Sequence, residues 1–264
     1  MKEQLYVIKI GGNVLDNPAA LEQFLADFSA LPYKKILVHG GGKAATALLP
    51  RLGIEPKMIN GRRITDEATL DVVTMVYAGL ISKTVTAKLQ ALGCNAIGLS
   101  GADGNFIRGT KRPVKEIDYG FAGDLDERSV DADGVSRLIE AVFTPVFSAI
   151  THNGNGQLLN TNADTIASAL AVALSAAYET HLVYCFEKKG VLQDVDDDAS
   201  LIAEIRAGEL ASLTEKGIIA GGMLPKLHNA FSAIEKGVKQ VTIGHAADLR
   251  NLGQHIPFGT TLTA

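Results

Sequence analysis

Short runs of β-branched and apolar residues alternate along the chain with longer segments whose apolar residues repeat at helical spacing. Residues 5–10 form a compact apolar run that ends at Gly11-Gly12. The helical pattern that follows opens at Asn17-Pro18 and repeats its apolar positions at Leu21, Phe24, Leu25 and Phe28. Because strand and helix patterns keep alternating, the sequence predicts an α/β fold with a mainly parallel central sheet and helices on both faces.

The remaining elements follow the same order. Further strands are expected at residues 35–39, 95–99, 143–149 and 181–185, and further helices at residues 43–52, 66–92, 131–141 and 162–176. The segment 104–130 is more polar and carries Gly and Pro, which predicts a hairpin insertion. A domain boundary is expected near residue 177, which divides the chain into residues 1–176 and 177–264.

Composition narrows the class of protein. The chain has 264 residues, and 25 Lys and Arg against 29 Asp and Glu give a formal net charge of −4. Without a basic run, nucleic acid is not expected as a partner. Cys94 and Cys185 form neither a zinc motif nor a disulfide framework, which predicts a reducing, cytoplasmic setting. No signal peptide is apparent and no window approaches the ~18 uncharged apolar residues of a membrane span, so no membrane association is expected.

Two glycine clusters each follow a predicted strand and precede a predicted helix. They read Lys9-Ile10-Gly11-Gly12 and His39-Gly40-Gly41-Gly42-Lys43. Glycine allows backbone N–H groups to approach an anion, and a helix N-terminus adds favourable partial charge. Tight turns alone would explain one cluster. Two clusters in consecutive βα units favour a site for phosphate or carboxylate.

The best-known fingerprints of other enzyme classes are missing. A P-loop is excluded because Lys43 is followed by Ala44, and no GxGxxG motif opens a helix as dinucleotide binding requires. The His-Gly-Gly-Gly segment would suit a hydrolase only beside a GxSxG nucleophile motif, and its nearest match, at residues 98–102, ends in Ala102.

Further candidate residues follow the later elements. Within Asn160-Thr161-Asn162-Ala163-Asp164, Asn162 is the expected helix cap, which leaves Asn160 to bind a ligand and Asp164 to orient nearby lysines. Lys226 lies near the start of a predicted helix, where a cation is unfavourable unless an anion shares the site.

Other charged residues leave more than one interpretation. Arg63 follows a tight turn, where it suits either carboxylate binding or simple solvent exposure. The Lys111-Arg112 pair and residues 196–198 are expected to be solvated loops. The histidines show neither an HxH nor an HExxH metal motif.

Taken together in this order, the motifs resemble the amino acid kinase family over essentially the whole chain. The segments Asn60-Gly61-Arg62-Arg63-Ile64-Thr65 and Asn160-Thr161-Asn162-Ala163-Asp164 are similar to the branch that acts on acetylglutamate. The resemblance implies an open αβα sandwich in which residues 1–176 bind the N-acyl glutamate and dimerise, and residues 177–264 bind ATP. It implies ATP-dependent phosphorylation of the γ-carboxylate of N-acetyl-L-glutamate, in arginine biosynthesis. The same reaction on N-succinyl-L-glutamate, or another activity of the family, stays open.

The resemblance also implies roles for individual residues. Lys9 and Lys226 would stabilise the transferring phosphoryl group, and Asp164 would hold these lysines. The acyl substrate would be bound by Gly41, Gly42, Arg63 and Asn160. The nucleotide would be bound by Gly11, Gly12, Glu187, Gly190, Gly222 and Met223, with Gly42 also facing the phosphates. Mg²⁺ would accompany ATP, held mainly by phosphates and water, with no metal site of protein ligands.

The chain departs from the family pattern in two places. Residues 186–190 read Phe-Glu-Lys-Lys-Gly where the family usually has Ser-Asp-Val-x-Gly. The first predicted strand also begins almost at Met1, whereas arginine-inhibited members carry an additional N-terminal helix. An arginine-insensitive homodimer is therefore expected. A non-catalytic sensor on the same fold would be expected to lack Lys9, Asp164 or Lys226, and all of these are present.

Overall fold

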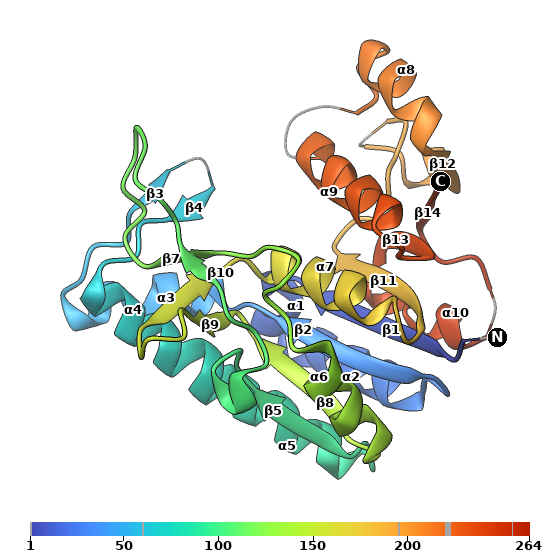
Figure 1. The fold of residues 1–264 in the computed structure, drawn as a ribbon. Coiled ribbons are helices and arrows are strands. Elements are labelled where there is room, and N and C mark those ends of the chain that lie inside the picture. The colour runs from blue at the N-terminus through green and yellow to red at the C-terminus, as the bar shows by residue number, and fades with distance from the viewer. Residues whose placement is uncertain (1, 60, 195, 220–222, 255) are drawn as a thin grey trace.

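The computed structural model describes residues 2–59, 61–194, 196–219, 223–254 and 256–264. Within this part of the chain, an eight-stranded sheet runs through the molecule in the order β12-β14-β13-β11-β1-β2-β8-β5 (Figure 1). Its strands are β1 (Gln4–Ile10), β2 (Lys34–His39), β5 (Ala96–Leu99), β8 (Thr144–Ser148), β11 (Glu179–Phe186), β12 (Glu204–Arg206), β13 (Gln240–His245) and β14 (Thr260–Thr263).

The central strands of this sheet are parallel. β1 pairs in parallel with β2 and β11, and β2, β8 and β5 continue in the same sense. The antiparallel pairing is that of β13 with β14 at the C-terminal end of the chain. Strand β1 is buried along most of its length, as its apolar sequence predicts. The predicted parallel sheet is thus confirmed.

Helices cover both faces of the sheet. Buried side chains of α7 and α9 share one hydrophobic cluster, and those of α2 and α5 share the other. The α-helices are α1 (Gly12–Asp16), α2 (Pro18–Ala30), α3 (Gly42–Leu48), α4 (Glu67–Thr74), α5 (Ser82–Ala91), α6 (Ala132–Glu140), α7 (Ala163–Leu174), α8 (Leu210–Glu215), α9 (Met223–Glu235) and α10 (Arg250–Gly253). Short 3₁₀ turns lie at Pro50–Leu52, Asp103–Asn105, Asp198–Ser200, Ala207–Glu209 and Ala246–Asp248. The αβα arrangement is therefore as expected.

The predicted helix over residues 66–92 is continuous but not uniform. It comprises α4, a π-helical segment (Met75–Ile81) and α5. The run Glu67–Ala91 also has a window with a mean hydropathy of 1.2, long and apolar enough to cross a membrane by length and composition. The run is interrupted by the charged residues Asp71, Lys83 and Lys88, so it is not the uncharged apolar stretch that the sequence analysis looked for. In the fold, side chains of this run such as Val73 and Leu89 belong to the hydrophobic core.

A smaller sheet lies at one end of the main sheet. The predicted insertion at 104–130 does contain a hairpin, in which β6 (Thr110–Lys111) pairs with β7 (Ala122–Asp124). This hairpin is extended by β10 (Leu158–Thr161) and β9 (Ile150–His152), which the sequence did not predict. A separate hairpin joins β3 (Met58–Ile59) to β4 (Arg62–Arg63). Thr65, just after β4, exchanges backbone hydrogen bonds with the insertion, so the two hairpins are connected.

The predicted domain boundary falls in the turn between α7 and β11. The main sheet crosses it without interruption, because β11 pairs with β1 along seven residue positions. The elements after the boundary, including α8 and α9, gather on one side of Figure 1 and the hairpin of β3 and β4 on the other. The separate roles of residues 1–176 and 177–264 stay a prediction.

Candidate active site between two cavities

The two glycine clusters lie side by side at one edge of the sheet. β1 and β2 are neighbouring parallel strands, and Ile10 is paired with His39 at their carboxyl ends. Each strand runs directly into a glycine turn and then into a short helix, α1 or α3. Ligands of open α/β sheets bind at this edge, where the strands end. The two glycine turns thus lie together at this edge, and their predicted role in binding phosphate or carboxylate stays a prediction.

Gly41 has a steric reason to be glycine. A Cβ atom there would lie 2.5 Å from Cδ1 of Ile81 and 2.7 Å from Cδ1 of Tyr77. Its backbone also has a φ of +155°. The π-helical segment therefore packs directly onto the glycine turn, which holds the start of α3 at the edge of the sheet.

Two cavities meet beneath these turns. The smaller has a volume of about 260 Å³, and its wall includes the candidate residues Lys9, Gly41, Gly42, Arg63, Asn160 and Asp164. The larger has a volume of about 810 Å³, and its wall includes Lys9, Gly11, Gly12, Asp164, Glu187, Gly190, Met223 and Lys226. Both are lined by Lys9, Gly12, Gly42, Arg63 and Asp164. All the described candidates thus lie at one site, whereas Gly222 and Asn60 lie outside the described residues.

Lys9 and Asp164 form an ion pair where the cavities meet. The Lys9 Nζ lies 2.7 Å from Oδ1 of Asp164, and the side chains are 12% and 26% exposed. Asp164 lies in the first turn of α7, whose N-cap Asn162 accepts hydrogen bonds from the backbone N–H groups of Asp164 and Thr165. Tyr184 on β11 donates a hydrogen bond to the Asp164 carbonyl at 3.3 Å. The backbone of Asp164 is therefore held from two sides, while its carboxylate contacts Lys9. The role of Asp164 in orienting the lysines stays a prediction.

Lys226 approaches the same junction from α9 but is held differently. Its Nζ lies 3.9 Å from the centre of the Phe186 ring, and Lys9 Nζ lies 5.2 Å from that centre. Among the described residues, no carboxylate lies within ion-pair distance of Lys226. Burial lowers the pKa of Lys226, as does the Lys9 charge, while Asp164 acts in the opposite direction. The expectation that Asp164 holds both lysines is met by direct contact for Lys9 alone.

Arg63 is buried, so it is not the solvent-exposed arginine of one of its two interpretations. It is 8% exposed, and its Nη2 donates hydrogen bonds to the Gly42 carbonyl at 2.9 Å and to Thr46 Oγ1 at 2.7 Å. Its Nη1 is buried without a partner among the described residues. An unsatisfied buried guanidinium nitrogen is costly. The arrangement suits an anionic ligand in the smaller cavity rather than a solvated turn.

Asn160 lines the smaller cavity but is not entirely free. Its Nδ2 donates a hydrogen bond to Thr65 Oγ1 at 3.0 Å. Part of its amide therefore joins β10 to the residue that follows the hairpin of β3 and β4. Thr65 in turn is fully buried. The contact fixes the orientation of the amide.

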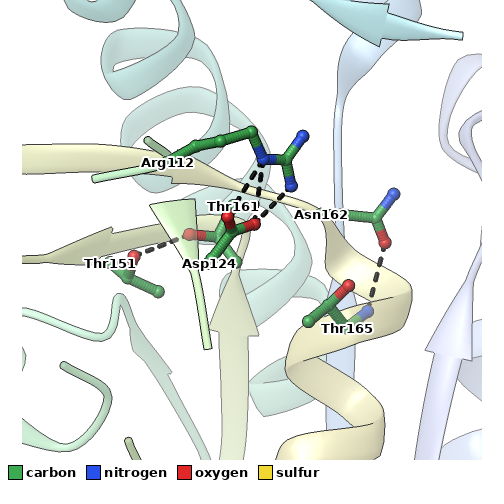
Figure 2. A network of polar contacts seen from close by, with 6 residues as sticks. All are labelled: Arg112, Asp124, Thr151, Thr161, Asn162 and Thr165. Carbon is green, nitrogen blue, oxygen red and sulfur yellow. Dashed lines mark hydrogen bonds and ion pairs between the residues drawn. The ribbon is translucent and has the colours of Figure 1, made fainter. Parts of the chain in front are cut away.

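Arg112 was expected in a solvated loop, and the structure places it in the wall of the smaller cavity instead. Its guanidinium forms hydrogen bonds and an ion pair with Asp124, on β7 (Figure 2). Figure 2 also shows the hydrogen bond between Thr151 and Thr161, 2.7 Å long, which joins β9 to β10 behind this pair. Arg112 is half-buried beside the small sheet, which is assembled from strands distant in the sequence. The 12-residue spacing of Arg112 and Asp124 in a predicted hairpin was the available signal.

A third cavity of about 550 Å³ continues the larger one. It shares Lys188, Gly190 and Met223 with the larger cavity and adds apolar side chains, Val191, Leu192 and Ile218 among them. Gly190 also has a packing role, because a Cβ atom there would lie 2.6 Å from Thr260 Oγ1. Glu187, Gly190 and Met223, which were predicted to bind the nucleotide, thus line one continuous hollow.

The site is lined by four lysines, Lys9, Lys43, Lys188 and Lys226, but by few carboxylates. Within the described ranges, no group of three or more His, Cys, Asp or Glu side chains is placed to hold a metal ion. Asp164 and Glu187 are the carboxylates among the candidates, and Asp164 is engaged by Lys9. The charge of the site therefore suits anionic ligands.

Comparison with known sequences gives the family. The profile described as Amino acid kinase family matches residues 4–245. A protein of Phocaeicola vulgatus named acetylglutamate kinase is 56% identical over 243 residues, which cover 92% of this chain and 94% of that protein. A protein of the same name from Bacteroides thetaiotaomicron is 54% identical over 251 residues, covering 95% and 97%. One from Methanopyrus kandleri is 40% identical over 241 residues, covering 90% and 93%.

Solved structures agree on the fold. An N-acetylglutamate synthase from Neisseria gonorrhoeae superposes with a TM-score of 0.82 at 24% identity, covering 99% of this chain and 59% of that one. A carbamate kinase from Giardia lamblia gives a TM-score of 0.68 at 15% identity, covering 99% and 98%. At these identities the structures establish the shared architecture alone.

Proposed function

The chain belongs to the amino acid kinase family, and we propose that it transfers the γ-phosphoryl group of ATP to the γ-carboxylate of N-acetyl-L-glutamate, in arginine biosynthesis. The observation that carries the proposal is the junction of two cavities of different size at Lys9 and Asp164. The smaller suits the acyl amino acid and the larger suits the nucleotide. The names of the relatives cited above support the choice of acceptor.

The acyl amino acid would be recognised by its α-carboxylate. The Nη1 of Arg63, buried and without a partner in the described part of the chain, is the donor best placed to bind it. Arginine presents its donors in a fixed fork that matches a carboxylate. Asn160, Gly41 and Gly42 would hold the acyl amide and the backbone of the substrate from the same wall.

The acceptor needs no general base. A side-chain carboxylate has a pKa of about 4 and is already ionised near pH 7. The barrier instead comes from bringing this anion against the phosphates, and phosphoryl transfer is promoted mainly by positioning and positive charge. Lys9 and Lys226 supply that charge from opposite parts of the chain, while Asp164 fixes Lys9.

The nucleotide would lie in the larger cavity with its phosphates toward the lysines. Gly11 and Gly12 would offer backbone N–H groups to the phosphates, and Glu187, Gly190 and Met223 would line the nucleoside side. Mg²⁺ would supply further neutralisation of the phosphate charge. Since Asp164 is engaged by Lys9, the ion would be bound mainly by phosphates and water.

We further propose a cytoplasmic homodimer. Met75 and Leu80 lie on the long helical run and are 54% and 66% exposed. Burial of such exposed apolar side chains against a second copy of the chain is favourable. Replacing both by Glu is expected to shift the protein from dimer to monomer in light scattering, whereas a monomeric unmodified protein would contradict the proposal.

Trapping of the acyl phosphate as a hydroxamate tests the function directly. Purified protein is incubated with MgATP, hydroxylamine and one acceptor at a time: N-acetyl-L-glutamate, N-succinyl-L-glutamate, L-glutamate, L-aspartate or carbamate. UMP is assayed separately by ADP release. We expect the highest kcat/KM with N-acetyl-L-glutamate.

Each other outcome has a definite meaning. A preference for the succinyl compound would keep the mechanism and change the acceptor. A preference for a free amino acid, carbamate or UMP would overturn the proposal. Nucleotide binding without any transfer would favour a sensor.

A further inference from the structure

Phe186 ends strand β11 at the point where the two candidate lysines meet. The centre of its ring lies 3.9 Å from Lys226 Nζ and 5.2 Å from Lys9 Nζ. Lys9 comes from β1 and Lys226 from α9, so one aromatic ring contacts ammonium groups that are 217 positions apart in the sequence, as 226 − 9 gives. Phe186 also lines the larger cavity.

The Phe186 ring is held in place by neighbouring residues of the sheet. Tyr184, two residues earlier on β11, stacks on it with ring centres 6.1 Å apart and planes inclined by 22°. The Tyr184 hydroxyl donates a hydrogen bond to the Asp164 carbonyl. Phe186 is also paired with His245 of β13 in the sheet. Its position is therefore set by the sheet and by the same α7 turn that carries Asp164.

The Phe186 ring contacts a lysine that lacks a carboxylate partner among the described residues. Lys9 has a carboxylate partner in Asp164, whereas Lys226 has none among the described residues. Two ammonium groups close together repel, and burial also disfavours the charge on Lys226. The face of an aromatic ring carries negative potential and attracts cations. At 3.9 Å, Phe186 supplies the attraction that a second carboxylate would otherwise provide.

We propose that Phe186 is a positioning residue, whose ring holds the Lys226 ammonium beside Lys9 at the junction of the two cavities. An aromatic ring achieves this without introducing a negative charge, which would repel the phosphates. This role rests on the proposed phosphoryl transfer. Cation–π attraction at partly desolvated sites corresponds to about a 3- to 30-fold effect on an equilibrium, so we expect kcat to fall within that range when the attraction is removed.

Stepwise fluorination of Phe186 tests the proposal without changing the shape of the side chain. The protein is prepared with phenylalanine, 4-fluoro-, 3,5-difluoro- and 3,4,5-trifluorophenylalanine at position 186. Each fluorine withdraws electron density from the ring face. We expect log kcat to decrease in steps along the series, with an unchanged melting temperature. Phe106, which packs edge-on against Phe147 at 6.2 Å, provides the matched control position, where the same series leaves kcat unchanged.

The protonation of Lys226 provides a readout that does not depend on turnover. Its pKa is obtained from the pH dependence of its labelling by an amine-reactive reagent, followed by mass spectrometry. The other charged groups of this cavity also act on the Lys226 ammonium, so they are left unchanged throughout the series. They are Lys9, Asp164, Glu187, Lys188, Lys43 and Arg63. We expect the trifluorinated ring to lower the pKa of Lys226, because the ammonium form loses its attraction to the ring, and to move the alkaline limb of the kcat profile to lower pH.

The outcomes separate this inference from the proposed function. If the unmodified protein is active but kcat and the pKa of Lys226 stay constant along the series, Phe186 is not a positioning residue. If kcat falls only in parallel with the melting temperature, the role is structural and the inference is again overturned. If the unmodified protein transfers no phosphoryl group, the proposed function fails, and the labelling experiment still decides whether the ring stabilises the Lys226 ammonium.

Discussion

Lys9 Nζ lies 2.7 Å from Oδ1 of Asp164, which joins the central strand β1 to the first turn of α7. The pair lies in the walls of both cavities, so its ammonium group faces any ligand in either one. Such a partly buried pair is a weak source of stability. Its position is better explained by the chemistry at the junction, where a fixed positive charge is needed.

Replacement of Lys9 by Ala is expected to remove a charge that acts in the transition state. Loss of one such donor lowers kcat by about 10²- to 10³-fold in comparable sites. Steady-state kinetics of hydroxamate formation measures the effect. Lys88→Ala, which removes a surface lysine paired with Glu22, is the matched control and should retain activity. Equal kcat values for Lys9→Ala and the control would rule out the proposed role.

Asp164→Asn keeps the size of the side chain and removes its charge. We expect kcat to fall at least about tenfold, since a mispositioned catalytic group costs as much as 10²-fold. The double variant Lys9→Ala/Asp164→Asn should be little worse than Lys9→Ala alone, because the two residues act as a unit. Independent, multiplicative losses would show that Asp164 does not act through Lys9.

Arg63→Ala is expected to weaken the binding of the acyl amino acid. The KM for N-acetyl-L-glutamate should rise about tenfold to a hundredfold, as for the loss of a charged hydrogen bond of about 1.5–3 kcal/mol. The KM for ATP should change much less. Arg63→Lys should not restore binding, because lysine lacks the guanidinium fork. Arg206→Ala, an exposed residue paired with Glu204, serves as the control. A rise in the KM for ATP alone would assign Arg63 to the nucleotide instead.

Gly41→Ala tests the close packing of the glycine turn. The added methyl group would collide with Ile81 and Tyr77, at 2.5 and 2.7 Å. Overpacking of this kind costs about 1–3 kcal/mol of unfolding free energy. Urea unfolding of Gly41→Ala and of Gly208→Ala, where the new Cβ meets no atom within 4 Å, gives the comparison. Similar stabilities of the two variants would contradict the packing of the turn described here.

The stability of the protein should decrease as the pH falls through the range set by His39. Burial lowers the pKa of His39 from 6.5 to about 4. Between these values the unfolded chain binds a proton that the folded protein does not, so the unfolding free energy falls as the pH falls. His39 alone should lower the unfolding free energy by about 2 kcal/mol between pH 7 and pH 4.5. Denaturant titrations at both pH values should show a smaller loss for His39→Gln, and an unchanged loss would assign it to other groups such as His181, whose pKa burial also lowers.

Local sequence patterns were sufficient to predict the strands and helices that flank the glycine turns. The apolar run before Gly11 and the cap at Asn162 depend on neighbours in the sequence, and the structure has both where they were expected. The wall around Arg112 could not be predicted in this way. It includes β7 and β10, which are short strands brought together only by the tertiary fold. The π-helical segment Met75–Ile81 similarly has no distinct signal in its apolar pattern.

The partner of Lys226 shows a second limit of sequence reasoning. The resemblance to the family implied that a carboxylate, Asp164, would hold both lysines. The structure instead places an aromatic ring, Phe186, beneath the Lys226 ammonium. The sequence showed Phe186 as a departure from the family pattern, but a contact between β11 and α9 depends on how the helix packs over the sheet.

A crystal structure of the protein with a non-hydrolysable ATP analogue, Mg²⁺ and N-acetyl-L-glutamate tests the central claim most directly. The account predicts the phosphates in the larger cavity between Lys9 and Lys226, and the α-carboxylate of the acyl amino acid on Arg63 in the smaller cavity. The γ-carboxylate should then point at the terminal phosphate beside the Lys9–Asp164 pair. A nucleotide bound elsewhere, or an acyl amino acid whose γ-carboxylate points away from Lys9, would contradict it.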